Sequence, residues 1–297
     1  MALWQARSVE GALRAAHPEI RCEIVVIRTL AEKFPDKEAS QIGAGIFTRE
    51  IDEALLRGEV DIAVHSLKDI PSEVPDGVAI GAVTERESPL DGFISADGTR
   101  FEGLPQGSRI GTGSPRRRAQ LLLHRSDLEI VPLRGNVATR LRKMAELSLR
   151  GIVLAVAGLQ RLGEAGRVTQ VLGPEILLPA PGQGALAITA RSDDAGTLSR
   201  ISALEHTPTR QAVTAERSYL RRLRGGCQVP AGALALRGPD GELTLTVLLA
   251  APDGSACVRG EMQGPGEEAE ELGVRLAEEI LDRGGLTILK ALGREAP

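Results

Sequence analysis

Alternating strand and helix patterns over the first two thirds of the chain limit its possible folds more than any other feature. Short apolar runs predict strands at 22–27, 61–65, 78–83, 109–112, 129–133, 152–157 and 185–189. Helices are predicted at 2–16 and 48–57, the second capped by Thr48 and stopped by Gly58. This alternation predicts parallel sheets covered by helices.

After about residue 200 the pattern changes. Three strand-like segments are separated by two Pro-Asp-Gly turns, and a helical segment lies on each side of them. The expected helices are 212–223 and 267–281, and the expected strands are 231–236, 243–249 and 256–260. The sequence therefore predicts an α/β fold followed by a small α+β domain with an antiparallel sheet. A length of 297 residues is ordinary for two or three domains.

Composition excludes several classes of protein. Hydrophobic residues make up 42% and charged residues 26%, as in ordinary soluble proteins, and no apolar run approaches the roughly 18 residues of a membrane span. The first residues have no basic region followed by an apolar core, so we expect a cytoplasmic protein without a membrane partner. A net charge of −4 and very few aromatic residues argue against nucleic acid.

The three cysteines Cys22, Cys227 and Cys257 lie far apart, without a C-x-x-C pair or a Cys/His cluster. That distribution argues against a structural metal and against a disulfide framework. Cys22 and Cys257 fall in strand-like segments and are expected in the core. Cys227 follows two glycines in Gly225–Pro230, a loop in which the thiol is either reactive or a buried small side chain.

Arginine dominates the basic residues, since only five of the 36 are lysines. One interpretation is genome composition. The other is that guanidinium groups bind carboxylates or phosphates through paired hydrogen bonds.

Polar and charged residues follow several predicted strands directly. The strand at 61–65 leads into His65-Ser66-Leu67-Lys68-Asp69, where Lys68 can hold Asp69 ionised. Ligands of open α/β sheets bind just past the carboxyl ends of strands, although a solvated loop with an incidental ion pair remains the alternative.

The segment 111–118 reads Gly-Thr-Gly-Ser-Pro-Arg-Arg-Arg and predicts an anion site. Ser114 can cap the helix that follows, and Pro115 suits its first position. Free N–H groups and the positive helix end would face the loop beside Arg116 and Arg117. The nucleotide-binding glycine patterns are absent, so a carboxylate is favoured; a basic surface helix is the alternative.

Two more strand ends carry arginines. Arg134, Gly135 and Arg140 follow the strand at 129–133, and Arg161 follows the strand at 152–157. Three strand ends followed by arginine predict a cleft that binds a polyanion.

Together, these motifs resemble the hydroxymethylbilane synthase (porphobilinogen deaminase) family. The resemblance covers nearly the whole chain. It is carried by Ala2–Ala6, Asp61–Pro71, Gly111–Arg117, Leu133–Arg140, Leu154–Leu162, Pro181–Ala185 and Gly225–Pro230.

The resemblance implies a transferase of tetrapyrrole (porphyrin and haem) biosynthesis that condenses four porphobilinogens into linear hydroxymethylbilane and releases four ammonia. It implies a dipyrromethane cofactor joined to Cys227 through a thioether, and no metal. Lys68 and Asp69 are implied as catalytic residues. The implied cofactor contacts are Lys68, Ser114, Arg116, Arg117, Arg134 and Gly135, and the implied substrate contacts are Arg140, Arg161 and Gln183.

The resemblance also implies a three-domain monomer whose first two domains are similar to periplasmic binding proteins, with a cleft between them. The expected domains are 1–84 with 185–202, then 88–180, and finally 207–297. The physical chemistry agrees, because each pyrrole adds an acetate and a propionate that arginines can pair with. A fixed carboxylate such as Asp69 can stabilise the cation left when ammonia departs.

Three departures from the family pattern stand out. Relatives have a strand with an arginine and a serine ahead of Ala2–Ala6, so the natural protein is expected to start ten to fifteen residues earlier. Ala44 stands where a lysine is common, and Leu149-Arg150-Gly151 replaces Tyr-Asp-Ala. The alternative function is a truncated or non-catalytic homologue that binds a polycarboxylate in the same cleft; the presence of Asp69 and Cys227 favours the enzyme.

Overall fold

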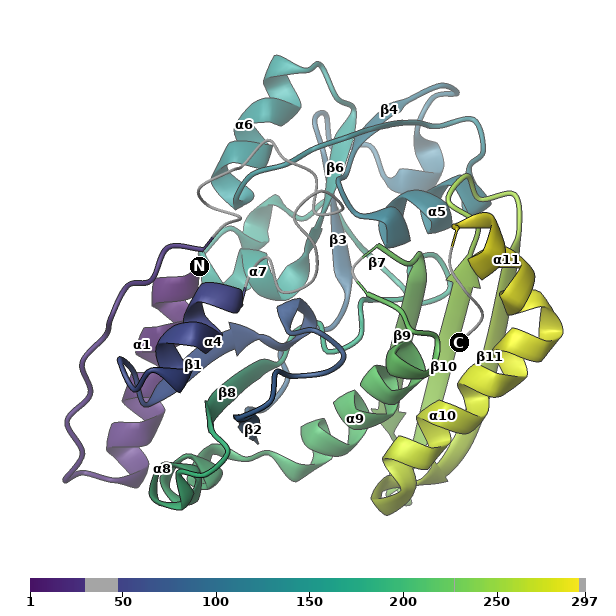
Figure 1. The fold of residues 1–297 in the computed structure, drawn as a ribbon. Helices are drawn as coiled ribbons and strands as arrows, with labels where there is room; N and C mark the ends of the chain where they lie inside the picture. The colour runs from purple at the N-terminus through teal and green to yellow at the C-terminus, as the bar shows by residue number, and fades with distance from the viewer. Residues whose placement is uncertain (30–47, 227, 294–297) are drawn as a thin grey trace. The chain divides into compact units, whose positions relative to one another are not determined.

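The computed structural model describes residues 1–29, 48–226 and 228–293, which form two compact units (Figure 1). Unit 1 comprises Met1–Glu87 and Gly184–Gln211, and unit 2 comprises Ser88–Gln183 and Ala212–Pro297. The chain therefore starts in unit 1, builds the first part of unit 2, returns to unit 1 over Gly184–Gln211 and then completes unit 2. The division into three domains stays a prediction.

Unit 1 is built around a three-stranded sheet with the strand order β1-β8-β2. Its elements are α1 (Ala2–Ala16), α4 (Arg49–Leu56), β1 (Ile62–Ser66), the 3-10 turn η1 (Leu67–Asp69), β2 (Val78–Val83), β8 (Leu186–Arg191), α8 (Ala195–Ile201) and the turn η4 (Ser202–Leu204). The central strand β8 pairs antiparallel with both neighbours. The parallel pairing expected from strand–helix alternation is thus not seen among the described strands of this unit.

The core of unit 1 forms where α1 meets the sheet. Val9 and Leu13, one helical turn apart, are buried against Ile188 and Ala190 of β8. Burial of each such side chain stabilises the fold by roughly 1.5–3 kcal/mol. Because β8 is covered in this way, β1 is held at its side and the residues after β1 take a fixed position.

The strand predicted at Cys22–Ile27 is wrong. The described residues 21–29 contain no strand, and Val25 and Val26 are 52% and 69% exposed. A strand needs a hydrogen-bonded neighbour, and the described pairings of this sheet join only β1, β8 and β2. The apolar composition of residues 22–27 alone was not enough to make them a strand, because they have no strand neighbour among the described residues.

Unit 2 contains a five-stranded mixed sheet with the order β5-β4-β6-β3-β7. Its strands are β3 (Asp91–Ser95), β4 (Arg109–Gly111), β5 (Glu129–Val131), β6 (Gly151–Ala155) and β7 (Gln170–Leu172). The associated helices and turns are η2 (Phe101–Gly103), α5 (Pro115–His124), α6 (Val137–Glu146), α7 (Val156–Arg161) and η3 (Ala165–Arg167). β4 is parallel to β5 and β6, whereas β3 is antiparallel to β6 and β7.

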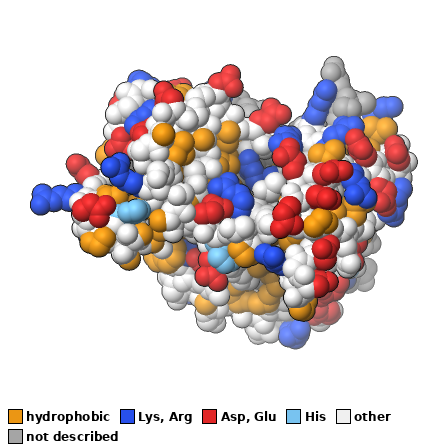
Figure 2. All heavy atoms as spheres, turned by 90° about the horizontal axis from the view of Figure 1, so that it is seen from below, with side chains coloured by type: hydrophobic (Ala, Val, Ile, Leu, Met, Phe, Trp, Pro, Cys, Tyr) orange, Lys and Arg blue, Asp and Glu red, His pale blue; other side chains and the backbone are white. Residues whose placement is uncertain are grey.

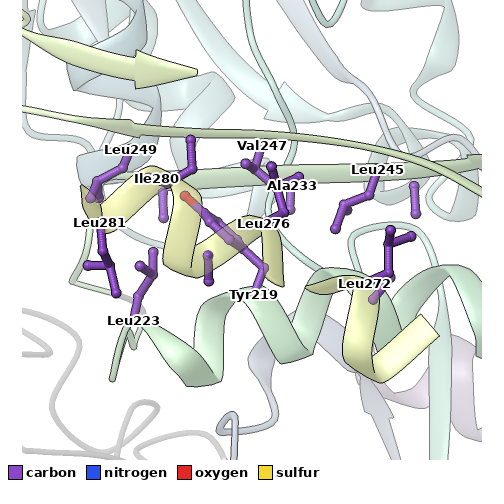
Figure 3. Packing of buried hydrophobic residues seen from close by; sticks show 14 of the residues in the cluster. Tyr219, Leu223, Ala233, Leu245, Val247, Leu249, Leu272, Leu276, Ile280 and Leu281 are labelled. Carbon is purple, nitrogen blue, oxygen red and sulfur yellow. The ribbon is translucent and has the colours of Figure 1, made fainter. Parts of the chain in front are cut away.

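The second sheet of unit 2 is antiparallel, with the order β11-β10-β9, as predicted. With it go α9 (Thr207–Arg222), which starts in unit 1, β9 (Ala231–Arg237), β10 (Glu242–Ala250), β11 (Cys257–Pro265), the 3-10 helix η5 (Gly266–Glu268), α10 (Ala269–Ile280), the π-helical segment η6 (Leu281–Gly285) and α11 (Leu286–Ala291). Figure 3 shows Tyr219 of α9 among Leu245 and Val247 of β10 and Leu276 and Ile280 of α10. Cys257 is exposed at the start of β11, so its predicted place in the core is wrong.

The fold class is confirmed as α/β with an additional α+β part. Most predicted strands agree with the structure within about two residues, but the strand predicted at 256–260 continues as β11 to Pro265. The run at 152–157 ends as a strand at Ala155 and continues as α7. None of the described helices combines the length and apolar character needed to cross a bilayer. On the face drawn in Figure 2, the coloured residues carry acidic and basic side chains next to one another, without the one-sign field typical of a nucleic-acid site.

Candidate functional site

The end of β1 presents the first predicted motif in unit 1. Alternate residues of β1 are buried, so His65 points into the core, and the chain then turns through η1 with Leu67 buried and Lys68 and Asp69 half-buried. Gln5 of α1 is 4% exposed and donates to Ser66 Oγ at 2.7 Å. The two ionisable side chains therefore sit on a turn that buried neighbours hold on both sides.

His65 itself is an internal residue. Its Nε2 lies 3.3 Å from Thr189 Oγ1 of β8, and burial lowers the pKa of His65 to about 4. The imidazole is neutral at pH 7 and fixes β1 against β8 rather than supplying charge.

The predicted anion loop of unit 2 lies between β4 and α5. Ser114 caps α5, with its Oγ accepting from Arg117 N, and Pro115 occupies the first helical position, as predicted. Gly113 approaches the neighbouring loop so closely that a Cβ would lie 2.8 Å from Leu133 O. A glycine is needed there because backbone cannot move aside as a flexible side chain can.

Arg116 and Arg117 lie side by side in the first turn of α5, and both are buried, at 5% and 6% exposure. They flank Asp91, the first residue of β3, which is fully buried. Burial alone would raise the pKa of Asp91, but the two guanidinium charges and their hydrogen bonds outweigh it and hold that pKa far below its usual range. The carboxyl group is therefore ionised at every physiological pH.

The start of α6 carries the third predicted motif. Asn136 caps the helix because its side-chain oxygen accepts a hydrogen bond from Thr139 N. Gly135 has φ +115°, a conformation that favours glycine, and an added Cβ would also lie only 2.6 Å from Thr139 Cγ2. Arg140 Nε donates to Gly135 O at 2.7 Å, and Arg134 and Arg140 are both half-buried. These two side chains are thus more accessible than Arg116 and Arg117.

Arg161 and Gln183 are buried. Arg161, at the end of α7, is 8% exposed, and Gln183 is 0% exposed. The Gln183 amide donates to Pro89 O at 2.7 Å and to Asp91 Oδ1 at 2.9 Å. Gln183 thereby joins Arg116 and Arg117 around the same carboxylate, a cluster that the motifs alone did not show.

The structure accordingly brings Arg116, Arg117 and Gln183 together and places Lys68 and Asp69 in the other unit. The predicted roles of all these residues stay predictions. Cys227 and Ala44 lie outside the described residues. Within the described part of the chain, no three His, Cys, Asp or Glu side chains are placed to share a metal ion.

Comparison with known proteins decides the family. The model described as "Porphobilinogen deaminase, dipyromethane cofactor binding domain" matches residues 1–199, and the model of the C-terminal domain of porphobilinogen deaminase matches residues 210–282. The chain belongs to the porphobilinogen deaminase family.

Relatives named porphobilinogen deaminase match this chain over almost its full length. The porphobilinogen deaminase of Carboxydothermus hydrogenoformans is 45% identical, covering 100% of this chain and 95% of the relative. That of Desulforudis audaxviator is 49% identical, covering 97% and 94%. The resemblance inferred from the motifs is therefore confirmed.

Among solved structures the similarity is lower. The periplasmic VFT2 domain of BvgS from Bordetella pertussis is 15% identical, with a TM-score of 0.39, and covers 67% of this chain and 75% of that one. The probable amino-acid ABC transporter extracellular-binding protein ytmK from Bacillus subtilis is 8% identical, with a TM-score of 0.40, and covers 68% of this chain and 79% of that one.

Proposed function

We propose that this chain is a hydroxymethylbilane synthase, a transferase of tetrapyrrole biosynthesis that condenses four porphobilinogens and releases four ammonia. One observation carries the proposal: the cofactor-binding-domain model matches residues 1–199, a range that includes Lys68, Asp69 and all five predicted ligand arginines. Cys227 falls in the second matched range, 210–282.

The residues of unit 2 suit a polycarboxylate cofactor such as dipyrromethane. Two buried guanidinium groups face a single carboxylate, so the cluster carries one unmatched positive charge, and Arg117 Nε has no hydrogen-bond partner among the described residues. A buried unpaired donor favours an additional acceptor. Arg116, Arg117 and Arg134 would hold cofactor carboxylates, and Ser114 and Gly135 stand in the same motifs as these arginines. Lys68 of unit 1 is proposed as a further cofactor contact, and the bound group would supply the covalent anchor for the growing chain.

Lys68 and Asp69 would act on the substrate. When ammonia leaves the aminomethyl group of porphobilinogen, positive charge develops on the pyrrole, and a fixed carboxylate stabilises such charge and can exchange protons with the pyrrole nitrogen. Half-burial of Asp69 on a turn held by Leu67 and Ile70 limits its movement, so little reorganisation is needed during the reaction. Arg140 and Arg161 are proposed to bind the carboxylates of substrate and product, whereas Gln183, whose amide already donates to Pro89 O and Asp91 Oδ1, is proposed to act through Asp91.

Covalent attachment gives the most direct test. Intact mass of the purified protein should exceed the mass of the bare chain by one dipyrromethane, and Cys227→Ser should lack both that increment and bilane synthesis. Cys22→Ser and Cys257→Ser are the matched controls, since Cys22 is half-buried and Cys257 exposed. Both controls should keep the increment and the colour given by acid Ehrlich reagent. Full colour in Cys227→Ser would exclude this attachment.

The same experiment separates the enzyme from a non-catalytic homologue. A homologue that only binds a polycarboxylate would bind porphobilinogen, but its intact mass would show no added dipyrromethane and it would make no bilane.

We also propose, from its family, that the protein acts as a monomer in the cytoplasm. Light scattering at micromolar concentration tests this, and a dimer would contradict it.

A further inference from the structure

Asp91 is the most completely enclosed carboxylate next to the predicted anion loop. It begins β3, its side chain is 0% exposed, and β3 pairs with β6 on one side and β7 on the other. Because the backbone of Asp91 is fixed between two strands, its carboxylate has little freedom to follow a moving partner. It can act as a rigid reference point for the groups around it.

Each guanidinium of the pair is held at two points. Arg116 donates to Asp91 Oδ2 at 2.8 Å and to Leu178 O at 2.6 Å. Arg117 donates to Asp91 Oδ1 at 2.6 Å and to Val153 O at 3.1 Å. One carboxylate oxygen is thus assigned to each arginine, an arrangement that fixes the spacing of the two planar groups.

The surroundings of Asp91 hold it in turn. Gln183 Nε2 donates to Asp91 Oδ1, and the loop that carries Gln183 is fixed because Gly182 N donates to Glu216 Oε2 at 2.7 Å. Glu216 Oε1 also accepts from Ala235 N of β9 at 2.8 Å. The carboxylate therefore receives support from both sheets of unit 2.

The charges of the cluster do not cancel. The two guanidinium groups belong to residues in the first turn of α5, and they face the single carboxylate of Asp91. The helix dipole is itself positive at this end of α5 and disfavours cations. A cluster serving only stability would balance its charges, because an unmatched buried charge is costly. The unpartnered Arg117 Nε marks a direction in which an acceptor is missing among the described residues.

We propose that Asp91 is a positioning residue of this enzyme: it locks Arg116 and Arg117 at a fixed spacing and lowers their joint charge to +1, so that the pair accepts one carboxylate of the bound pyrrole chain. The proposal rests on the function proposed above. Asp91 does not touch the ligand and acts through the two arginines, which distinguishes it from Asp69.

The test compares Asp91→Asn and Asp91→Glu with wild type and with Asp127→Asn as a matched control. Asp127 lies between α5 and β5 of the same unit, pairs with Arg125 at 2.7 Å and is 24% exposed, so its substitution also breaks an Asp–Arg pair. Three quantities are measured: the fraction of molecules that carry dipyrromethane by intact mass, the thermal midpoint, and KM and kcat per loaded molecule.

We expect both Asp91 variants to be loaded several-fold less than wild type, with KM for porphobilinogen raised about tenfold and kcat changed less than threefold. Asp91→Glu keeps the negative charge but displaces it by one methylene group. Its thermal midpoint should therefore recover relative to Asp91→Asn, whereas loading and KM stay impaired. Asp127→Asn should keep wild-type loading and KM.

If the ion pair serves only stability, a different result is expected. Cofactor loading and KM would then change in step with the thermal midpoint from variant to variant, or would stay at wild-type values in every variant that folds. Either result overturns the proposal. If Asp91→Asn is insoluble, Asp91→Glu decides alone, since wild-type loading and KM in that variant exclude a positioning role. Wild-type protein without dipyrromethane and bilane synthesis would instead refute the proposed function itself.

Discussion

Two aspartates of this chain, Asp69 and Asp91, carry the same side chain into opposite environments. Asp69 lies half-buried on the short turn η1 after β1 of unit 1. Asp91 is fully buried at the start of β3 of unit 2, between two arginines and a glutamine. A carboxylate with fixed, saturated partners is suited to holding other groups, and one that keeps accessible surface is suited to meeting a ligand.

The contrast also separates what each residue contributes to stability. Breaking a buried ion pair by removing one partner commonly costs about 3–5 kcal/mol, whereas exposed and half-exposed pairs contribute about 1 kcal/mol or less. Loss of Asp91 should therefore destabilise the fold, and loss of Asp69 should mainly affect the reaction.

Asp69→Asn gives the largest expected effect on turnover. We expect kcat to fall about 100-fold or more, because a preorganised charge facing developing positive charge is removed, while KM changes little. Steady-state kinetics on protein shown by mass to carry the cofactor makes the measurement. The thermal midpoint should fall less than in Asp91→Asn. Near-normal turnover in Asp69→Asn would mean that Asp69 does not act on the reaction, and that it does not differ from Asp91 in this way.

Glu216→Gln sharpens the comparison with a third carboxylate. Glu216 is fully buried like Asp91, and its carboxylate accepts hydrogen bonds from the backbone N–H groups of Gly182 and Ala235. A glutamine would turn its NH₂ group towards one of these donors and leave that donor unpaired, at a cost of about 2–3 kcal/mol in the free energy of unfolding.

Urea unfolding at pH 7 measures that cost. Glu270→Gln is the control, since Glu270 pairs with Arg221 at the surface and is 65% exposed; its change should stay below about 1 kcal/mol. Equal effects of the two substitutions would mean that burial of the carboxylate does not decide its contribution.

Sequence patterns predicted the elements in which local chemistry and final environment agree. The Ser114-Pro115 start of α5 and the strands β9 and β10 of the second sheet of unit 2 were predicted correctly. β3 was missed because it begins Asp91-Gly92, two residues typical of turns, and becomes a strand only through pairing with β6 and β7. The wrong strand at 22–27 shows the reverse case, an apolar run without a described neighbour.

The candidate site divides in the same way. Lys68, Asp69, Arg116 and Arg117 stand in contiguous motifs, and their roles were predicted from those motifs. Asp91 was missed because its partners Arg116, Arg117 and Gln183 lie 25, 26 and 92 residues further along the chain. An aspartate directly before an apolar strand was the only available signal, and composition could not connect it to the arginines.

The pH dependence of stability tests a buried group of unit 1. His65 is buried neutral with a pKa of about 4, while an unfolded histidine titrates near 6.5. The unfolded state therefore binds the proton more readily, so the stabilisation is fully present above pH 6.5 and is lost as the pH falls towards 4. Between pH 7.5 and 5 we expect His65 to account for a loss of about 2 kcal/mol in the free energy of unfolding.

Urea unfolding at the two pH values, for wild type and His65→Gln, gives that contribution by difference. His17→Gln is the matched control: the side chain of His17 is 25% exposed and lies 3.8 Å from Glu19. Loss of the pH dependence in the His17 variant, and its retention in the His65 variant, would show that burial of His65 is not its source.

The smallest expected effect comes from Tyr219, whose buried hydroxyl, unlike the Asp91 carboxylate, has no hydrogen-bond partner in the described part of the chain. The ring lies inside the core of the second sheet of unit 2, fully buried, and its hydroxyl has no hydrogen-bond partner among the described residues (Figure 3). Burial raises the pKa of Tyr219 well above its usual range. Because Tyr219 is the only tyrosine in the sequence, tyrosinate absorbance should appear only as the protein unfolds at high pH.

Tyr219→Phe removes the unpaired hydroxyl and keeps the ring, so we expect the free energy of unfolding to rise by about 1 kcal/mol. Tyr219→Leu is the control for shape: it leaves space beside Leu223 and Ile280 and should lower the same quantity by about 1–3 kcal/mol. Urea midpoints of the three proteins order these effects. If Tyr219→Phe is less stable than wild type, the Tyr219 hydroxyl forms a hydrogen bond in solution. Tyr219 and Asp91 would then both be buried polar groups with hydrogen-bond partners, and the contrast between them would be lost.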